Sequence, residues 1–280
     1  MMAASSCMLT PSIYGEVVRA LCVASASSVA ARDLLRDPLR VATGLADDMA
    51  QHGVALDQQL VYQSLLLFLQ TIRNVPRISE ELGLEAKSGE ELATLYSHTA
   101  NQALDFFRRC TDGTPAHAAV VPDLRAHNVL LKILCMARDE NKALALIGDM
   151  ETGGKLEPSR ETYNIMMRRM VEVDILRAED IMIRMTNKGI APDERTMDTF
   201  LRAYYFSGPS GASTAISMVQ GCFNQFQTRP SISAYMEVID SLIQNENMPE
   251  VSRAAIVYTQ LWPDETKPLY DSLDTKGLGY

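Results

Sequence analysis

The side chains that most often carry chemistry are scattered along this chain. The sequence contains five cysteines and four histidines. These residues are Cys7, Cys22, Cys110, Cys135, Cys222, His52, His98, His117 and His127. They form no CxxC pair and show no spacing typical of a metal site. We therefore expect reduced and mostly buried thiols, and no bound metal.

The sequence also lacks the motifs of common enzymes. It has no Ser/His/Asp or Cys/His signature, no glycine-rich phosphate loop and no carboxylate pair on a recognisable scaffold. We therefore predict that the protein is not an enzyme and uses no cofactor or small-molecule substrate.

Basic residues in the centre of the chain could contact phosphates. The formal net charge is −9, but residues 124–193 hold 11 basic and 11 acidic residues, which makes them the least acidic part. Lys132, Arg168 and Arg169 lie there. Because affinity for RNA depends largely on Lys and Arg near phosphates, we expect any RNA contact in this region. Basic residues on an ordinary solvated helix face are the alternative interpretation.

A repeated apolar pattern predicts the elements that carry these residues. The word Ala-x-x-φ-φ-x-x-φ, in which φ is apolar, begins at Ala42, Ala103, Ala143, Ala178, Ala215 and Ala254. Positions i, i+3, i+4 and i+7 lie on one face of an α-helix, so each word predicts an apolar stripe. The small first residue allows a close crossing with a second helix.

A second helix with a bulkier first residue precedes each of these words. Its stripe begins at Tyr14, Val61, His127, Tyr163, Met197 and Tyr235. The repeating unit is therefore a helical hairpin that occurs about six times. One hairpin cannot bury its stripe from both sides, so we expect an all-α solenoid that is stabilised by stacking of neighbours.

The ends of the units carry capping signals. Met185 is followed by Gly189, Pro192 and Asp193, and Met49 by Gly53 and Asp57. Glycine after the last apolar residue is typical of a helix C-cap, and aspartate before the next helix is typical of an N-cap.

With Thr162-Tyr163-Asn164 opening the intervening helix, residues 124–193 resemble two pentatricopeptide repeats (PPR). Ala143 and Ala178 are 35 residues apart, which matches the length of the repeat in that family. The remaining units match less closely. A tetratricopeptide array is the alternative, but that repeat expects a Trp in its first helix, and the only Trp is Trp262. The PPR resemblance implies a right-handed superhelical solenoid.

We predict one solenoid domain with irregular ends. The approximate repeats are 11–57, 58–123, 124–159, 160–193, 194–231 and 232–265. The second repeat carries an insertion near 72–97, which we expect to form an acidic loop. This loop would be either solvated or in contact with a protein partner. Residues 266–280 are either a tail or a truncated repeat.

The PPR resemblance also implies which residues read RNA. In this family each repeat reads one base with two or three side chains, including the residue after the Tyr anchor and the last residue of the unit. Carried over, these are Asn128 with Ser159, which implies cytosine, and Asn164 with Asp193, which implies uracil. Both asparagines could instead be ordinary polar residues at helix starts.

The other units depart from that pattern. Their corresponding residues are Gly15 with Asp57, Tyr62 with Asp123, Asp198 with Ser231, and Met236 without a clear partner. The residue that sandwiches the base is commonly aliphatic in the family, but is Arg125, Glu161 or Arg195 here.

The N-terminal composition bears on localisation. Residues 1–32 are rich in Ala and Ser and contain one acid, Glu16. This composition is typical of an organellar transit peptide, although the stripe from Tyr14 fits the first helix of the first repeat. Together with the resemblance it favours a mitochondrion, with a plastid as the alternative.

We therefore predict an organellar PPR-like protein that binds single-stranded RNA or acts within a mitochondrial ribonucleoprotein, with protein subunits as partners and no membrane association. The candidate RNA-binding residues are Asn128, Ser159, Asn164, Asp193, Lys132 and Arg168. A protein-protein interaction scaffold without RNA readout is the alternative.

Overall fold

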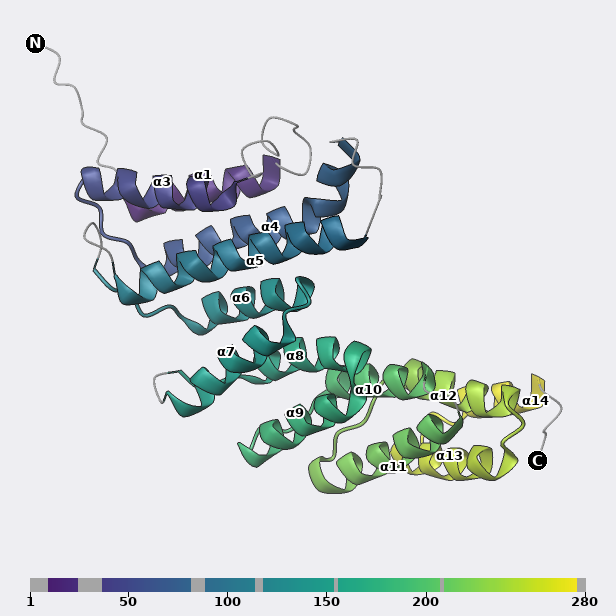
Figure 1. Cartoon of the computed structure of the whole chain (residues 1–280). Helices are drawn as coiled ribbons and strands as arrows, with labels where there is room; N and C mark the ends of the chain where they lie inside the picture. The colour runs from purple at the N-terminus through teal and green to yellow at the C-terminus, as the bar shows by residue number, and fades with distance from the viewer. Residues whose placement is uncertain are drawn as a thin grey trace, which may run out of the picture. The chain divides into compact units, whose positions relative to one another are not determined.

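The computed structural model of the chain describes residues 10–24, 37–81, 89–113, 118–153, 156–206 and 209–275 (Figure 1). Within these ranges the elements are α-helices joined by short connections, and no β-strand occurs. The prediction of an all-α fold of helical hairpins is thus confirmed for the described part of the chain. The helices form two compact units, Met1–Pro158 and Ser159–Tyr280. The superhelical sense stays a prediction.

Six described helices belong to the first unit. They are α1 (Pro11–Ala24), α3 (Pro38–Gln51), α4 (Gln58–Glu81), α5 (Gly89–Asp112), α6 (Leu124–Met136) and α7 (Glu140–Thr152). α4 packs against α1 and α6, so the first helices of successive hairpins form one row. α3 packs against α5, which places second helices side by side in the same unit.

Seven described helices belong to the second unit. They are α8 (Arg160–Val173), α9 (Ile175–Asn187), α10 (Glu194–Phe206), α11 (Pro209–Phe226), α12 (Ile232–Gln244), α13 (Met248–Leu261) and α14 (Lys267–Thr275). α8 pairs with α9, α10 with α11 and α12 with α13 (Figure 1). α8, α10, α12 and α14 pack in succession and form the row of first helices.

The repeated alanines lie in the interior of both units. Ala42, Ala103, Ala143, Ala178, Ala215 and Ala254 each expose at most 1% of their surface. Larger side chains of the same stripes, such as Ile147 and Met185, are buried beside them. A small residue at these positions lets the helix backbones approach closely, which is the role that the pattern predicted.

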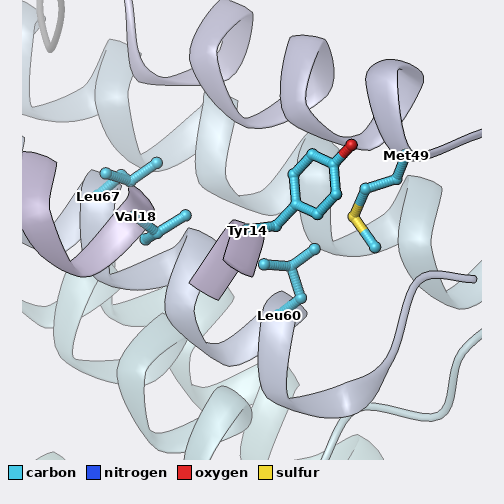
Figure 2. Close-up of a cluster of buried hydrophobic side chains, with 5 residues drawn as sticks. All are labelled: Tyr14, Val18, Met49, Leu60 and Leu67. Atoms are coloured by element: carbon cyan, nitrogen blue, oxygen red, sulfur yellow. The ribbon is translucent and has the colours of Figure 1, made fainter. Parts of the chain in front are cut away.

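The first hairpin includes part of the segment with transit-peptide composition. Tyr14 and Val18 of α1 are buried against Met49 of α3 and against Leu60 and Leu67 of α4 (Figure 2). The Tyr14 hydroxyl donates a 2.6 Å hydrogen bond to the Asp48 carboxylate. Residues 11–24 are therefore an integral helix of the stack, while 1–9 and 25–36 lie outside the described residues.

Two helices end in the glycine caps that the sequence indicated. After α9, the Ile190 amide donates to the Met185 carbonyl at 3.1 Å, and the Gly189 amide donates to the Thr186 carbonyl at 2.9 Å. Gly189 has a φ of 76°, which side chains other than glycine rarely adopt. This is a Schellman motif, and α3 ends in the same way at Gly53.

The expected acidic loop near 72–97 is wrong for most of that range. Residues 72–81 continue α4, and 89–97 belong to α5, so that both helices are 24 residues long. Ile72 and Val75 are buried, because the apolar stripe of α4 extends beyond the length of the other first helices. The insertion thus lengthens the hairpin, and residues 82–88 lie outside the described ranges.

The segment after Trp262 contains a further helix, α14, that joins the row of first helices. Leu269 and Leu273 of α14 are buried, and α14 packs against α12. The Ser272 hydroxyl donates a 2.6 Å hydrogen bond to Asp240 of α12. The described part of residues 266–280 is thus packed on α12, and residues 276–280 lie outside the described ranges.

No helix among the described residues combines the length and the apolar character that crossing a bilayer requires.

The buried alanines predict a position-specific cost of enlargement. Ala143 is fully buried on α7, whereas Ala145 is exposed on the same helix. Ala143→Leu should lower the free energy of unfolding by about 1–3 kcal/mol, because added methyl groups force the helices apart. Ala145→Leu should change it by less than about 0.5 kcal/mol. Urea unfolding of both variants measures the difference, and equal effects would contradict the crossing at Ala143.

His127 predicts a pH dependence of stability. Its ring packs edge-on against Phe107 with centroids 4.9 Å apart, and Nδ1 lies 2.9 Å from the Asp123 carbonyl oxygen. Burial lowers the pKa of His127, although the nearby Asp123 opposes this effect. The unfolded chain therefore binds more protons just below its own His pKa of about 6.5, and stability falls as pH drops through that window.

His127→Tyr should weaken this pH dependence, because Tyr163 and Tyr235 occupy the equivalent buried positions without an imidazole to protonate. Urea unfolding at about pH 8 and about pH 5.5 measures the stability loss in each chain. The loss should be smaller in His127→Tyr than in the unsubstituted protein. His98 is exposed, so His98→Tyr is the control. An unchanged loss in His127→Tyr would show that His127 does not contribute to it.

Candidate functional site

The capping residues set a common register for the first helices. Asp123, Ser159 and Ser231 are the N-caps of α6, α8 and α12, and each accepts a backbone N–H with its side chain. Asp193 does the same for α10, where the Thr196 amide donates to its Oδ1 at 2.9 Å. Counted from each cap, the fifth residue is the position expected to follow the Tyr anchor. The cap of one first helix and the fifth residue of the preceding one form a candidate reading pair.

The structure brings Asn164 and Asp193 together. Asn164 Nδ2 donates to Asp193 Oδ1 at 3.3 Å. The Thr196 hydroxyl lies 2.7 Å from Asn164 Oδ1 and 2.8 Å from Asp193 Oδ1, and so joins both side chains. Both Asn164 and Asp193 are only half-buried. The pair is thus held by the cap of α10 while part of it faces solvent.

This arrangement leaves one donor and one acceptor available. An amide nitrogen carries two hydrogens, and only one of those on Asn164 is used by Asp193. Within the described residues, Asp193 Oδ2 accepts no hydrogen bond. Burial would raise the pKa of Asp193, but hydrogen bonds from Thr196 and Asn164 and the charge of Arg160 outweigh it and hold the pKa below its usual value. Asp193 is therefore a charged acceptor at neutral pH.

The other predicted pair is divided between the two units. Asn128 is 5% exposed and lies on α6 of the first unit, together with the half-buried Lys132. Ser159 caps α8 of the second unit, where its backbone N–H donates to Thr162 Oγ1 at 3.1 Å. Within its own unit Asn128 is a largely buried amide, so it has less surface for a ligand than Asn164.

A different pair is closed by its own hydrogen bonds. The Ser231 amide donates to Asp198 Oδ1 and the Ser231 hydroxyl donates to Asp198 Oδ2, both at 2.8 Å. Both carboxylate oxygens of Asp198 are thus engaged. Thr266 directly precedes α14 and its carbonyl accepts from the Tyr270 amide at 3.2 Å, so it holds the cap position that corresponds to Met236, which the sequence did not reveal.

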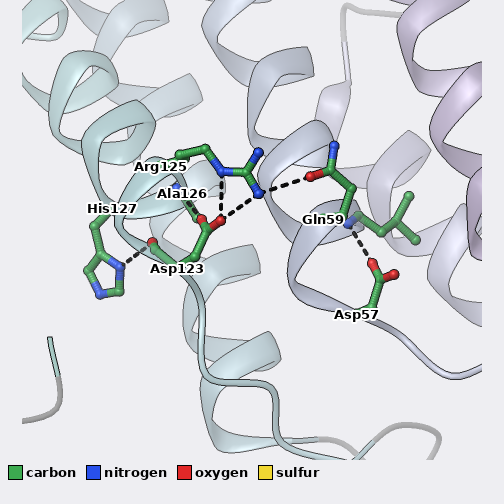
Figure 3. Close-up of polar contacts among 7 residues, drawn as sticks. Asp57, Gln59, Asp123, Arg125, Ala126 and His127 are labelled. Atoms are coloured by element: carbon green, nitrogen blue, oxygen red, sulfur yellow. Dashed lines mark hydrogen bonds and ion pairs between the residues drawn. The ribbon is translucent and has the colours of Figure 1, made fainter.

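In the second hairpin an arginine covers the reading position. The Arg125 guanidinium lies 4.9 Å from the centroid of the Tyr62 ring. It also forms a 2.7 Å ion pair with Asp123 and donates to Gln59 Oε1 at 3.0 Å (Figure 3). Arg125 therefore takes part in the contact between α4 and α6, and the aromatic face of Tyr62 is occupied by a cation.

In the first hairpin a side chain from the neighbouring helix fills the reading position. A Cβ atom on Gly15 would collide with Oε1 of Gln63, which projects from α4. Gln63 is 7% exposed and lines a pocket of about 260 Å³ with Arg19 and Asp57. A side chain at position 15 would therefore require the end of the Gln63 side chain to move.

The second unit contains a larger groove between α8 and α10. The groove has a volume of about 800 Å³ and is lined by Arg168, Arg195 and Arg202, with Glu172, Asp198 and Thr199. Of the candidate basic residues, Arg168 therefore lies in the groove, whereas the adjacent Arg169 forms a 2.9 Å ion pair with Glu172.

Arg202 was missed at the sequence level, although a signal exists. Lys132, Arg168 and Arg202 are each the ninth residue after their cap, and they are 36 and 34 residues apart. This spacing matches the repeat, so aligning the units by their caps instead of by apolar stripes would have identified Arg202.

Within the described residues no group of three or more His, Cys, Asp or Glu side chains could hold a metal ion. Cys22, Cys110, Cys135 and Cys222 form no disulfide among the described residues, and burial raises the pKa of Cys110 to about 12.

No protein-family model matches the sequence, and no curated protein matches it. Among solved structures, the chain is similar to the crystal structure of the pentatricopeptide repeat protein PPR10 from maize, with 15% identity, 99% of this chain and 46% of that chain covered, and a TM-score of 0.46. It is also similar to PPR10 in complex with an 18-nt psaJ RNA element, with 18% identity, 96% and 38% coverage, and a TM-score of 0.43. The chain spans less than half the length of these structures.

The repeated hairpins, the buried alanine crossings and the cap-linked polar pairs define this chain as a helical-repeat protein.

The role of Asp193 as the N-cap of α10 predicts different stabilities for two substitutions at this position. Asp193→Ala should lower the free energy of unfolding by about 0.5–2 kcal/mol, because the Thr196 amide loses its acceptor. Asp193→Ser should keep most of that stability, since serine is an equally good N-cap and already serves α8 and α12. Urea unfolding compares the two variants. Equal losses in both would show that the cap does not depend on the side-chain oxygen.

Proposed function

We propose that this protein binds single-stranded RNA along the first helices of its second unit. The observation that carries the proposal is the Asn164–Asp193 pair, which is held by Thr196 and retains one free N–H donor and one free carboxylate acceptor. The Watson–Crick edge of a pyrimidine presents donors and acceptors side by side, so this pair can hydrogen-bond it directly. By the PPR resemblance, the preferred base is uracil.

The neighbouring charges support RNA as the ligand. Arg168 lies one helical turn after Asn164 on α8, and residues four apart share a helix face. A strand whose base reaches Asn164 would therefore have its backbone near a guanidinium. The overall charge of −9 opposes a polyanion, so we expect modest affinity in the isolated protein and steep weakening as salt rises.

The base preference can be tested by a cap-preserving substitution. Asp193→Ser keeps the N-cap and converts the pair to asparagine with serine, the combination that the PPR resemblance assigns to cytosine. The ratio of oligo(U) affinity to oligo(C) affinity should fall by at least about fivefold, which corresponds to about 1 kcal/mol of discrimination. Fluorescence anisotropy at low salt measures both affinities.

Asp174→Ser is the matched control for this experiment. Asp174 is the N-cap of α9, where it accepts hydrogen bonds from the Leu176 and Arg177 amides, and it lies outside the reading pair. The control should leave the affinity ratio unchanged. Equal ratios for Asp193→Ser, Asp174→Ser and the unsubstituted protein would refute base reading at this pair. Failure of the unsubstituted protein to bind any of the oligonucleotides at low salt would refute RNA binding.

We propose further that the protein acts in a mitochondrion, or alternatively a plastid, as part of a ribonucleoprotein. The composition of residues 1–32 supports an organelle. A fluorescent fusion of the full chain tests this proposal, and cytosolic fluorescence would contradict it.

A protein scaffold is the second candidate function. Leu176 and Ile183 are 67% and 53% exposed on α9, and residues seven apart lie on the same helix face. These side chains support a protein contact. The double substitution Leu176→Glu/Ile183→Glu should abolish the crosslink to a protein partner. This crosslink should persist after ribonuclease treatment in the unsubstituted protein, because it does not depend on RNA. Persistence of the crosslink would reject this face as the contact.

A further inference from the structure

The arginine side chains that line the groove between α8 and α10 form no ion pair with any described residue. Arg168, Arg195 and Arg202 all line the groove, and all three are exposed. Among the described residues, none of their side chains forms an ion pair or a hydrogen bond. We call Arg168, Arg195 and Arg202 the arginine triad.

The acidic side chains beside the triad are already engaged. Glu172 forms a 2.9 Å ion pair with Arg169. Asp198 accepts two 2.8 Å hydrogen bonds from Ser231, which occupy both of its oxygens. The Thr199 hydroxyl donates to the Arg195 carbonyl at 2.8 Å. The groove therefore presents three guanidinium groups that form no ion pair among the described residues, together with two carboxylates that interact with neighbouring side chains.

The helix register spreads the triad along the groove. Arg195 and Arg202 are seven residues apart on α10, which places them on one face and separates them by roughly 10 Å along the axis. Arg168 faces them from α8. This spread fits a ligand with several negative groups along its length better than one small anion.

We propose that the arginine triad binds the phosphate backbone of a single strand, while the Asn164–Asp193 pair reads its base; the proposal rests on the proposed RNA binding. The guanidinium fork matches phosphate oxygens in two-point hydrogen bonds. Arg195 occupies the position that the PPR resemblance assigns to an aliphatic base clamp, so a charge contact replaces apolar packing there. Asp198 is closed by Ser231, and the second unit consequently contacts the strand at α10 through phosphate.

The experiment separates phosphate contact from base reading by means of two ligands. One is a single-stranded RNA of mixed sequence, and the other is an abasic strand of equal length, which keeps phosphates and lacks bases. Affinities for the full chain, for Arg195→Gln/Arg202→Gln and for Lys188→Gln are measured across a salt series. Lys188 is exposed in the same unit and lies outside the groove, which makes it the matched control.

The double variant should show a salt dependence that is shallower by about 1.4 in the logarithmic slope, since each phosphate contact contributes about 0.7 for a single strand. From about 50 to about 200 mM salt, the unsubstituted protein should lose about sevenfold more affinity than the double variant. The same difference should appear with the abasic strand, and Lys188→Gln should keep the original slope.

The outcomes distinguish this inference from the proposed function. An unchanged slope in the double variant, with RNA binding and the Asp193→Ser shift intact, would overturn the triad and leave base reading in place. Abasic-strand binding that depends on the triad, without any base preference, would support the triad and reject the reading pair. Equal competition by an oligoglutamate of the same charge would overturn the assignment to phosphate and assign the groove to an acidic protein segment.

Discussion

The close crossing of two helices at an alanine is the constraint on which the rest of this structure depends. The hairpins bury their larger stripe residues because the first stripe residue of the second helix is small, as at Ala143 and Ala178. Neighbouring hairpins then complete the burial, since no hairpin can cover both of its sides. A row of first helices results in each unit, and the candidate RNA-binding residues lie on such a row or on its caps.

The helix caps connect the fold to the candidate site. Asp193 ends one repeat and directly precedes α10, where its carboxylate accepts the amide hydrogen of Thr196. The same carboxylate accepts from Asn164 of the preceding first helix. Because the residue that begins a helix also closes a polar pair, stability and recognition use the same atoms. Ser231 differs, because its N–H and O–H donate to both oxygens of Asp198. That pair therefore has less hydrogen-bonding capacity for a ligand.

Charge determines where on this acidic chain a polyanion could bind. A net charge of −9 disfavours nucleic acid overall, yet charges act over about 10 Å or less at ordinary ionic strength. The charges near a binding site therefore matter more for its affinity than the net charge of the chain. Three arginines and two acidic residues, Glu172 and Asp198, line the groove, so its lining has an excess of basic side chains although the whole chain is acidic.

The sequence by itself determined the helices, the alanine crossings and the glycine caps, because each depends on spacing within one or two helical turns. It also indicated the proximity of Asn164 and Asp193 through the PPR resemblance. Only the tertiary structure decided that residues 72–81 and 89–97 extend two helices, that Gln63 fills the space beside Gly15, and that Thr196 joins the reading pair. These features depend on which side chains meet across neighbouring helices, and a linear pattern does not contain those distances.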